Sequence, residues 1–286
     1  MRWYGVAGRH HLPWRATRDP WAVLVTEVML QQTSVSRVLP RWESFLARWP
    51  EPARAAAEPL ETVLREWDGL GYPRRARALW ETAAIVAANG WPADEAGLLA
   101  LPGVGAYTAR ALLAFSFGAE DCAPPRDVNL GRVAARAALG VEPHAASSSR
   151  LDAELISGRP AATPLRDYTF ALFDLGATLC RARTARCEEC PLTGCRSRGH
   201  VLERLTSEPP PRRQAAYSGS LRQLRGAVLR ELLGPRPPVT VEELTARVAA
   251  APAASRAGAV AEALAGLTAD GLIDMRWRPT AMERAS

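Results

Sequence analysis

Apolar residues recur every three or four positions along most of this chain, which is the spacing of an α-helix. Runs of this kind lie at residues 20–32, 38–49, 60–67, 76–88, 107–117, 129–139, 168–180, 221–233, 241–250 and 256–269. Residues 272–277 have the pattern of a strand instead, and the polar residues 144–150 predict a loop. The pattern therefore predicts a mainly α-helical protein.

A proline-rich segment divides the chain into two unequal parts. Residues 206–217 include three consecutive prolines and predict an extended linker between a first domain, 1–205, and a C-terminal module, 218–286. Three helices followed by a strand-like segment are typical of a small winged helix, which we expect for this module. A small helical adaptor fits the same pattern.

Composition adds a modest indication about the partner. The net charge is +6 and the isoelectric point is about 9.5, which favours a polyanion. All 36 basic residues are arginines. The first residues lack an apolar signal segment and no run reaches the length of a membrane span, so we expect a soluble, cytoplasmic monomer without a membrane partner.

A glycine-containing turn precedes the apolar run 107–117. Gly103 and Gly105 lie two residues apart and leave backbone N–H groups uncovered at the start of the expected helix. This arrangement suits a phosphate group. An ordinary corner between two helices is the alternative.

Three further positions allow both a structural and a functional interpretation. Glu27, the one acid in the run 20–32, either faces solvent or is a buried acid with a raised pKa. Asp127 precedes a predicted helix and could serve as its N-cap. Tyr72 lies among glycines and arginines, either in a packed loop or as a wedge that stacks into DNA.

Four of the five cysteines are crowded together, which favours a metal or cluster site over disulfides. They follow the spacing Cys180-x6-Cys187-x2-Cys190-x4-Cys195 and can hold either zinc or a 4Fe–4S cluster. Spacing alone slightly favours zinc. Cys122 lies outside the group, and we expect an inert thiol there.

Taken together, these motifs resemble the helix-hairpin-helix DNA glycosylase superfamily, and residues 3–198 look like a MutY-type adenine glycosylase. The resemblance implies a two-lobed helix-hairpin-helix glycosylase fold with an iron–sulfur loop at 180–195, held by the four clustered cysteines. It also implies that Glu27 is the general acid at adenine N7, that Asp127 stabilises the sugar cation and that Tyr107 supports both. By the same resemblance, Trp14, Arg15, Leu30 and Asp174 would line the flipped adenine, Gln32 and Tyr72 would read the opposite base, and Gly103 and Gly105 would hold the DNA backbone.

The implied activity is excision of adenine mispaired with guanine or 8-oxoguanine in double-stranded DNA. Relatives that also cut the strand carry a lysine in the hairpin, where this chain has Tyr107 and no lysine anywhere, so we expect no strong lyase activity. The chain departs from the family at Arg126, at Val128 and in the last cysteine gap. Its 69-residue C-terminal module is also shorter and more helical than the usual module that reads 8-oxoguanine.

Two other functions fit part of the pattern. A glycosylase for thymine or another mismatched base would share the fold, although thymine has no N7 for Glu27 to protonate. A non-catalytic iron–sulfur DNA-binding regulator would use the C-terminal module, but it would not need both acids.

Overall fold

The computed structural model describes residues 1–200, 217–238 and 240–273, and every regular element in these ranges is a helix or a helical turn. The described residues form two compact units: residues 1–28 with 91–200, and residues 29–90 with 217–238 and 240–273. Helix α2 (Pro20–Leu30) carries the chain from the first unit into the second. None of the described helices is long and apolar enough to cross a membrane.

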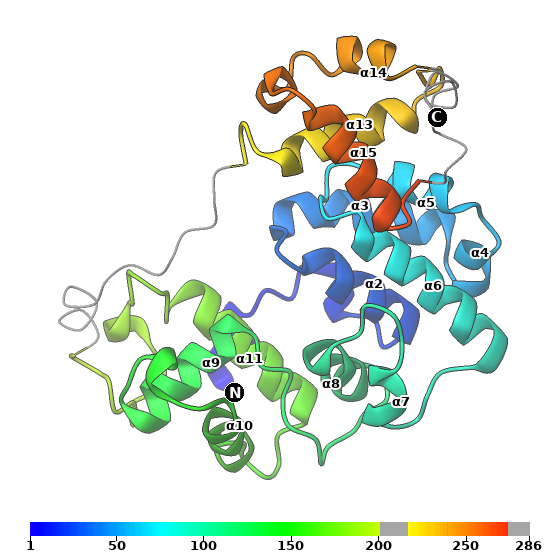
Figure 1. Ribbon diagram of the computed structural model, residues 1–286. Helices are drawn as coiled ribbons and strands as arrows, with labels where there is room; N and C mark the ends of the chain where they lie inside the picture. Colours follow the sequence, from blue (N-terminus) through cyan, green and yellow to red (C-terminus); the bar gives the residue numbers. More distant parts are fainter. Residues whose placement is uncertain (201–216, 239, 274–286) are drawn as a thin grey trace. The chain divides into compact units, whose positions relative to one another are not determined.

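The first unit is built around helices α9, α10 and α11 (Figure 1). Its elements are α1 (Arg2–Ala7), η1 (Pro13–Arg15), α7 (Glu95–Leu99), α8 (Ala106–Phe115), α9 (Val128–Ala134), η2 (Ala135–Leu139), η3 (Pro143–Ala145), α10 (Ser148–Ser157), α11 (Leu165–Thr178) and η4 (Cys187–Glu189). Leu130, Leu151, Leu155 and Leu175 form the centre of its apolar core. Burial of these side chains is the main force that holds the three helices together.

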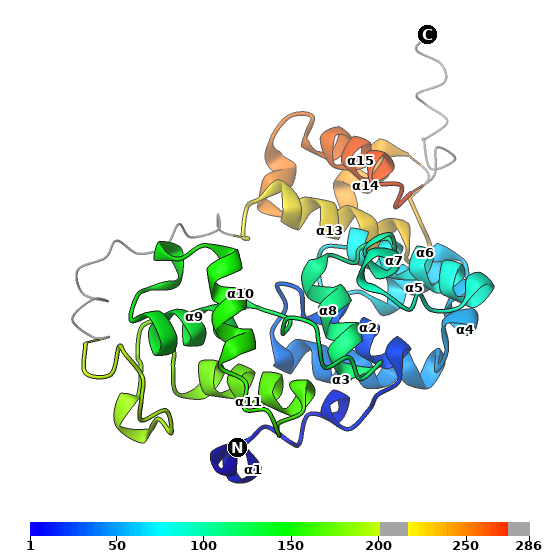
Figure 2. The ribbon, with the colours of Figure 1, turned by 90° about the horizontal axis from the view of Figure 1, so that it is seen from below.

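The second unit joins helices from two distant parts of the sequence. Its elements are α3 (Val35–Arg48), α4 (Pro52–Ala56), α5 (Leu60–Glu66), α6 (Arg74–Asn89), α13 (Leu221–Leu232), α14 (Val241–Arg247), η5 (Pro252–Ser255) and α15 (Ala259–Ala269). Helix α6 packs against α4 and α5, and α13 packs against α15 (Figure 2). The rings of Phe45 and Trp49 meet edge to face at 4.6 Å between centroids, a favoured aromatic geometry.

The helices predicted from apolar spacing are confirmed, with boundaries that differ by a few residues. The predicted loop at 144–150 is wrong at its end, because Ser147 caps α10 by accepting a hydrogen bond from the backbone N–H of Arg150 at 3.2 Å. The predicted helix 129–139 changes at residue 135 into the wider π-helical turn η2.

The three helices expected in the C-terminal module are present as α13, α14 and α15. Of the strand-like residues 272–277, Leu272 and Ile273 are not in a strand, and the other four lie outside the described residues. The linker 206–217 also lies outside them, except for Tyr217. The winged-helix prediction therefore stays a prediction.

Candidate active site

A hairpin connects α7 to α8 in the first unit. Gly103 has a φ of +74°, a left-handed conformation that glycine adopts without strain. Gly105 is the N-cap residue of α8, and nothing lies within 4 Å of the position that a Cβ would take. Both glycines are exposed. The N-terminus of α8 is therefore open to an anion such as a DNA phosphate.

Glu27 on α2 is buried, with only 7% of its surface exposed. Burial raises the pKa of this carboxyl from its ordinary 4.5 to about 7, and the negative charge of Asp127 also raises this pKa. Two other groups lower it: the Tyr107 hydroxyl, which donates a hydrogen bond to Glu27, and the cation of Arg15. The solvent-facing alternative for Glu27 is therefore wrong. At neutral pH about half of the molecules therefore carry a proton on Glu27 that can be donated.

Asp127 is the N-cap of α9. Its Oδ1 accepts hydrogen bonds from the backbone N–H groups of Asn129 and Leu130, each at 2.8 Å, and its Oδ2 accepts one from the Asn129 side chain at 2.7 Å. Burial raises the pKa of Asp127, while these three donors favour its charged form. Arg132, one turn along α9, in turn donates to the Asn129 side-chain oxygen at 2.8 Å. The cap thus fixes the carboxylate beside the Glu27–Tyr107 pair.

Asp174 on α11 lies at the centre of a buried cluster of charges. It is fully buried and accepts hydrogen bonds from Arg15 at 2.7 and 3.0 Å and from Arg9 at 2.5 and 2.8 Å. The Arg15 guanidinium also lies over the Phe170 ring at 4.4 Å, and Trp14 beside it is buried. Asp174 therefore holds Arg15 in place, and its own contact with adenine stays a prediction. Arg9 was not singled out from the sequence.

Arg126 precedes Asp127, at a position where the chain departs from the family pattern, and it forms an ion pair with Asp152 on α10. Its Nε donates to Asp152 at 2.6 Å, and Arg110 of α8 donates to the other oxygen of Asp152 at 2.9 Å. Burial opposes ionisation of Asp152, but these two arginines prevail and lower its pKa. Asp152 thus links α8, the second helix of the hairpin, to the residue that directly precedes Asp127.

Gln32 and Tyr72 belong to the second unit, as does Leu30 at the end of α2. Among the described residues, only these two non-glycine residues have a positive φ, 55° at Gln32 and 48° at Tyr72. Such backbone strain costs of order 1–2 kcal/mol per residue and is concentrated at functional sites. The two residues expected to read the opposite base are thus the two that adopt this conformation.

Arg75 on α6 ties together the two strained segments. Its guanidinium donates to the carbonyls of Met29 and Gln31 at 3.1 and 2.6 Å, and to those of Leu70 and Gly71, each at 2.9 Å. Burial lowers the pKa of Arg75 to about 10, so it stays charged at neutral pH. Sequence patterns did not reveal Arg75, because its acceptors are backbone groups that become neighbours only in the fold.

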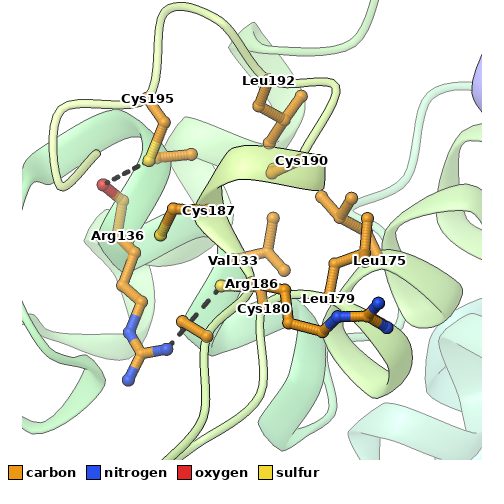
Figure 3. Close-up of a pocket in the computed structure, with 12 residues that line it drawn as sticks. Val133, Arg136, Leu175, Leu179, Cys180, Arg186, Cys187, Cys190, Leu192 and Cys195 are labelled. Carbon is orange, nitrogen blue, oxygen red and sulfur yellow. Dashed lines mark hydrogen bonds between the residues drawn. The ribbon is translucent and has the colours of Figure 1, made fainter. Parts of the chain in front are cut away.

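The four clustered cysteines face one pocket in the first unit (Figure 3). The pocket contains about 350 Å³ of empty space, part of it open to solvent, between Val133, Leu175, Leu179 and Leu192. Within the described ranges, no three Cys, His, Asp or Glu side chains are arranged closely enough to hold a single metal ion. The donor set and its apolar walls nevertheless suit a group that four thiolates bind together.

Arg136, in η2, fastens both ends of the cysteine loop. Its side chain pairs with Glu142 at 2.7 Å, donates to the carbonyl of Arg181 at 2.8 Å and lies 3.8 Å from the Cys180 sulfur. Its own carbonyl accepts from the backbone N–H of Ser197 at 3.1 Å. The π-helical turn thus joins the loop to the same helix that begins at Asp127, a connection that the sequence did not reveal.

Comparison with known proteins identifies the family. The model of the HhH-GPD superfamily of base excision DNA repair proteins matches residues 25–156, which include Glu27, Tyr107 and Asp127. An adenine DNA glycosylase of Mycobacterium tuberculosis (strain CDC 1551 / Oshkosh) is 42% identical over 251 residues, which cover 85% of this chain and 80% of the relative. An adenine DNA glycosylase of Mycolicibacterium smegmatis (strain ATCC 700084 / mc(2)155) is 42% identical over 281 residues, 96% of this chain and 91% of the relative.

A solved structure gives the same result for the fold. A thermostable thymine-DNA glycosylase matches 68% of this chain and 88% of its own, with a TM-score of 0.60 and 28% identity. The helix-hairpin-helix glycosylase fold predicted from the sequence is thereby confirmed. The chain belongs to the adenine DNA glycosylase family of the HhH-GPD superfamily of base excision repair proteins.

Proposed function

We propose that this protein hydrolyses the N-glycosidic bond of adenine mispaired with guanine or 8-oxoguanine in double-stranded DNA, without strong lyase activity. The observation that carries the proposal is the burial of Glu27 beside Tyr107 and Asp127. Because its pKa is about 7, Glu27 can donate a proton at neutral pH. Similarity to two adenine DNA glycosylases over most of the chain supports the choice of base.

The chemistry needs a proton for the departing base and a negative charge near the sugar. Protonated Glu27 donates its proton to adenine N7, and the bond between base and sugar breaks as the leaving adenine becomes neutral. The Asp127 carboxylate stabilises the sugar cation. A water molecule then adds to the sugar carbon that held the base and releases its extra proton, which the Glu27 carboxylate can take up to restore the acid. Because Asp127 is fixed by three N–H donors, its charge is already oriented before the reaction begins.

The lack of lysine supports hydrolysis without strong lyase activity. A lyase of this fold forms a Schiff base through a lysine amine, but Tyr107 occupies the hairpin helix here and the sequence contains no lysine. The expected product is therefore an intact strand with an abasic site.

We also propose that Cys180, Cys187, Cys190 and Cys195 hold a 4Fe–4S cluster. The four thiols surround one pocket, and the spacing of the cysteines matches the family loop except for the last gap. When bound, such a cluster would cross-link the loop and order its arginine-rich surface for contact with phosphates. Arg136 would hold the loop from the side of α9.

Similarity to a thymine-DNA glycosylase structure supports one alternative substrate. Thymine lacks N7, so a thymine enzyme would not depend on proton donation from Glu27 to that atom. The alternative therefore predicts excision that survives loss of the acid.

A panel of duplexes tests both substrates. Single-turnover excision is measured on A:G, A:8-oxoguanine, T:G and A:T pairs, and products are separated on denaturing gels with and without hot alkali. We expect adenine excision from the first two duplexes and strand breaks only after alkali. Thymine release from T:G without adenine release would overturn the choice of base, and rapid cleavage without alkali would overturn the hydrolytic mechanism.

A further inference from the structure

Aromatic rings and guanidinium groups alternate in a ladder that runs through the second unit into its C-terminal module. The buried Trp67 ring lies 5.4 Å from the Arg75 guanidinium, which lies 5.5 Å from the Tyr72 ring. On the module's side, the Arg222 guanidinium of α13 lies 5.9 Å from Tyr72 and 5.6 Å from Tyr217. Each of these spacings is within the range of a cation–π attraction.

Arg222 holds Tyr72 in a second way. Its Nη1 donates a hydrogen bond to the Tyr72 hydroxyl at 3.1 Å. The Tyr72 side chain is thus contacted by one cation from α6, another from α13 and a donor at its hydroxyl. These contacts restrict the rotation of a ring whose backbone already has a φ of 48°.

Other contacts dock the module without Arg222. The side chain of Arg65 on α5 donates to the carbonyl of Leu233 at 2.7 Å, and Arg230 of α13 pairs with Asp68 at 3.1 Å. Arg77 of α6 donates to the carbonyl of Asp270, beyond α15, at 2.5 Å. Since three separate contacts hold α13 and the end of α15 without Arg222, we expect removal of Arg222 mainly to release Tyr72.

We propose that Arg222 is a positioning residue for Tyr72, and that through it the C-terminal module takes part in discriminating the base opposite the target adenine. The inference rests on the proposed function and on the further prediction that Tyr72 stacks into the duplex at that base. A ring held at one angle fits one distortion of the base stack better than others, and a freely rotating ring fits them more equally. Loss of Arg222 should therefore reduce selectivity more than overall affinity.

Binding, measured independently of excision, tests this inference. Dissociation constants are measured by fluorescence anisotropy with full-length protein on duplexes that carry a non-cleavable adenine analogue opposite 8-oxoguanine, guanine or thymine. The variants are Arg222→Ala, Arg222→Lys and Tyr72→Phe, with Arg230→Ala as the matched control because it removes a docking contact from the same helix. Far-ultraviolet circular dichroism checks that each variant is folded.

We expect Arg222→Ala to reduce the ratio between the thymine and 8-oxoguanine dissociation constants about three- to tenfold, the range of a single cation–π contact or hydrogen bond. Arg230→Ala should leave the ratio within about twofold of wild type, and Arg222→Lys should restore part of it because an ammonium group can still donate to the hydroxyl. In the Tyr72→Phe background, Arg222→Ala should have a smaller effect.

An unchanged ratio in Arg222→Ala, or an equal loss in Arg230→Ala, would overturn the inference. Excision by wild type is measured alongside. If wild type releases no adenine from any mismatch, the proposed function fails, whereas the binding ratios still decide whether Arg222 positions Tyr72.

Discussion

Substitution of Glu27 by glutamine removes the proposed acid while keeping the size of the side chain. With a pKa of about 7, Glu27 is about half protonated at neutral pH, whereas a carboxyl at the ordinary 4.5 would be protonated in about one molecule in 300. Glu27→Gln should therefore lower the single-turnover rate of adenine excision at least about a hundredfold. In wild type, the rate should fall about tenfold per pH unit above the pKa, and the variant should lack this decline.

The same substitution should make the protein more stable at alkaline pH. Because folding raises the Glu27 pKa, the folded state binds the proton more tightly, so this contribution to stability is complete below about pH 4.5 and is lost as the pH rises through about 7. The difference of about 2.5 pH units corresponds to about 3 kcal/mol. Near pH 8, the free energy of unfolding of Glu27→Gln should therefore be about 3 kcal/mol higher than that of wild type. Near pH 4, the two values should differ by little.

The assays are a pH–rate series under single-turnover conditions and urea unfolding at the two pH values. Glu43→Gln, at an exposed position on α3, is the control and should change neither result by much. The reasoning is refuted if Glu27→Gln excises adenine at near wild-type rates. A wild-type stability that does not fall relative to Glu27→Gln between the two pH values would refute the raised pKa.

Three further outcomes are expected. Asp127→Asn should keep the cap of α9, since asparagine caps helices equally well, yet lower the excision rate at least about a hundredfold; a near-normal rate would contradict its role at the sugar. Asp174→Asn should lower the free energy of unfolding by about 3 kcal/mol or more, because two arginines lose their buried partner. The control Glu51→Gln, in an exposed ion pair, should change it by less than about 1 kcal/mol, and equal losses in urea unfolding would contradict this prediction. Protein purified without air should be yellow-brown and contain about four irons per chain, and stoichiometric zinc would contradict the cluster. Cys187→Ser should lose this colour, whereas the control Cys122→Ser should keep it.

Apolar spacing predicted the helices because it reports which face of a helix is buried. It also marked Glu27 as an acid inside an apolar run, but it left open whether that acid is buried; the roles of Glu27, Asp127 and Tyr107 were predicted from the resemblance to the glycosylase family. The pattern could not reveal the turn at residue 135, where the helix widens and Arg136 fastens the cysteine loop.

Arg75 and Arg222 show a second limit. Arg75 binds carbonyls from two separate segments, and Arg222 lies 150 positions from the tyrosine that it contacts. In a chain whose 36 basic residues are all arginines, neither residue type nor local spacing separates these two from an arginine on a solvated surface. Only the folded arrangement does so.

The left-handed backbones of Gln32 and Tyr72 affect how this protein could search a genome. Undamaged base pairs vastly outnumber mispairs, so most encounters with DNA must end quickly. A reading loop that had to rearrange at every step would limit the number of positions inspected during each encounter. Here Arg75 keeps both segments in the same strained form in the free protein. In the proposed role of these two residues, inspection of a base pair then needs no rearrangement of the loop backbone, a motion that takes nanoseconds to microseconds.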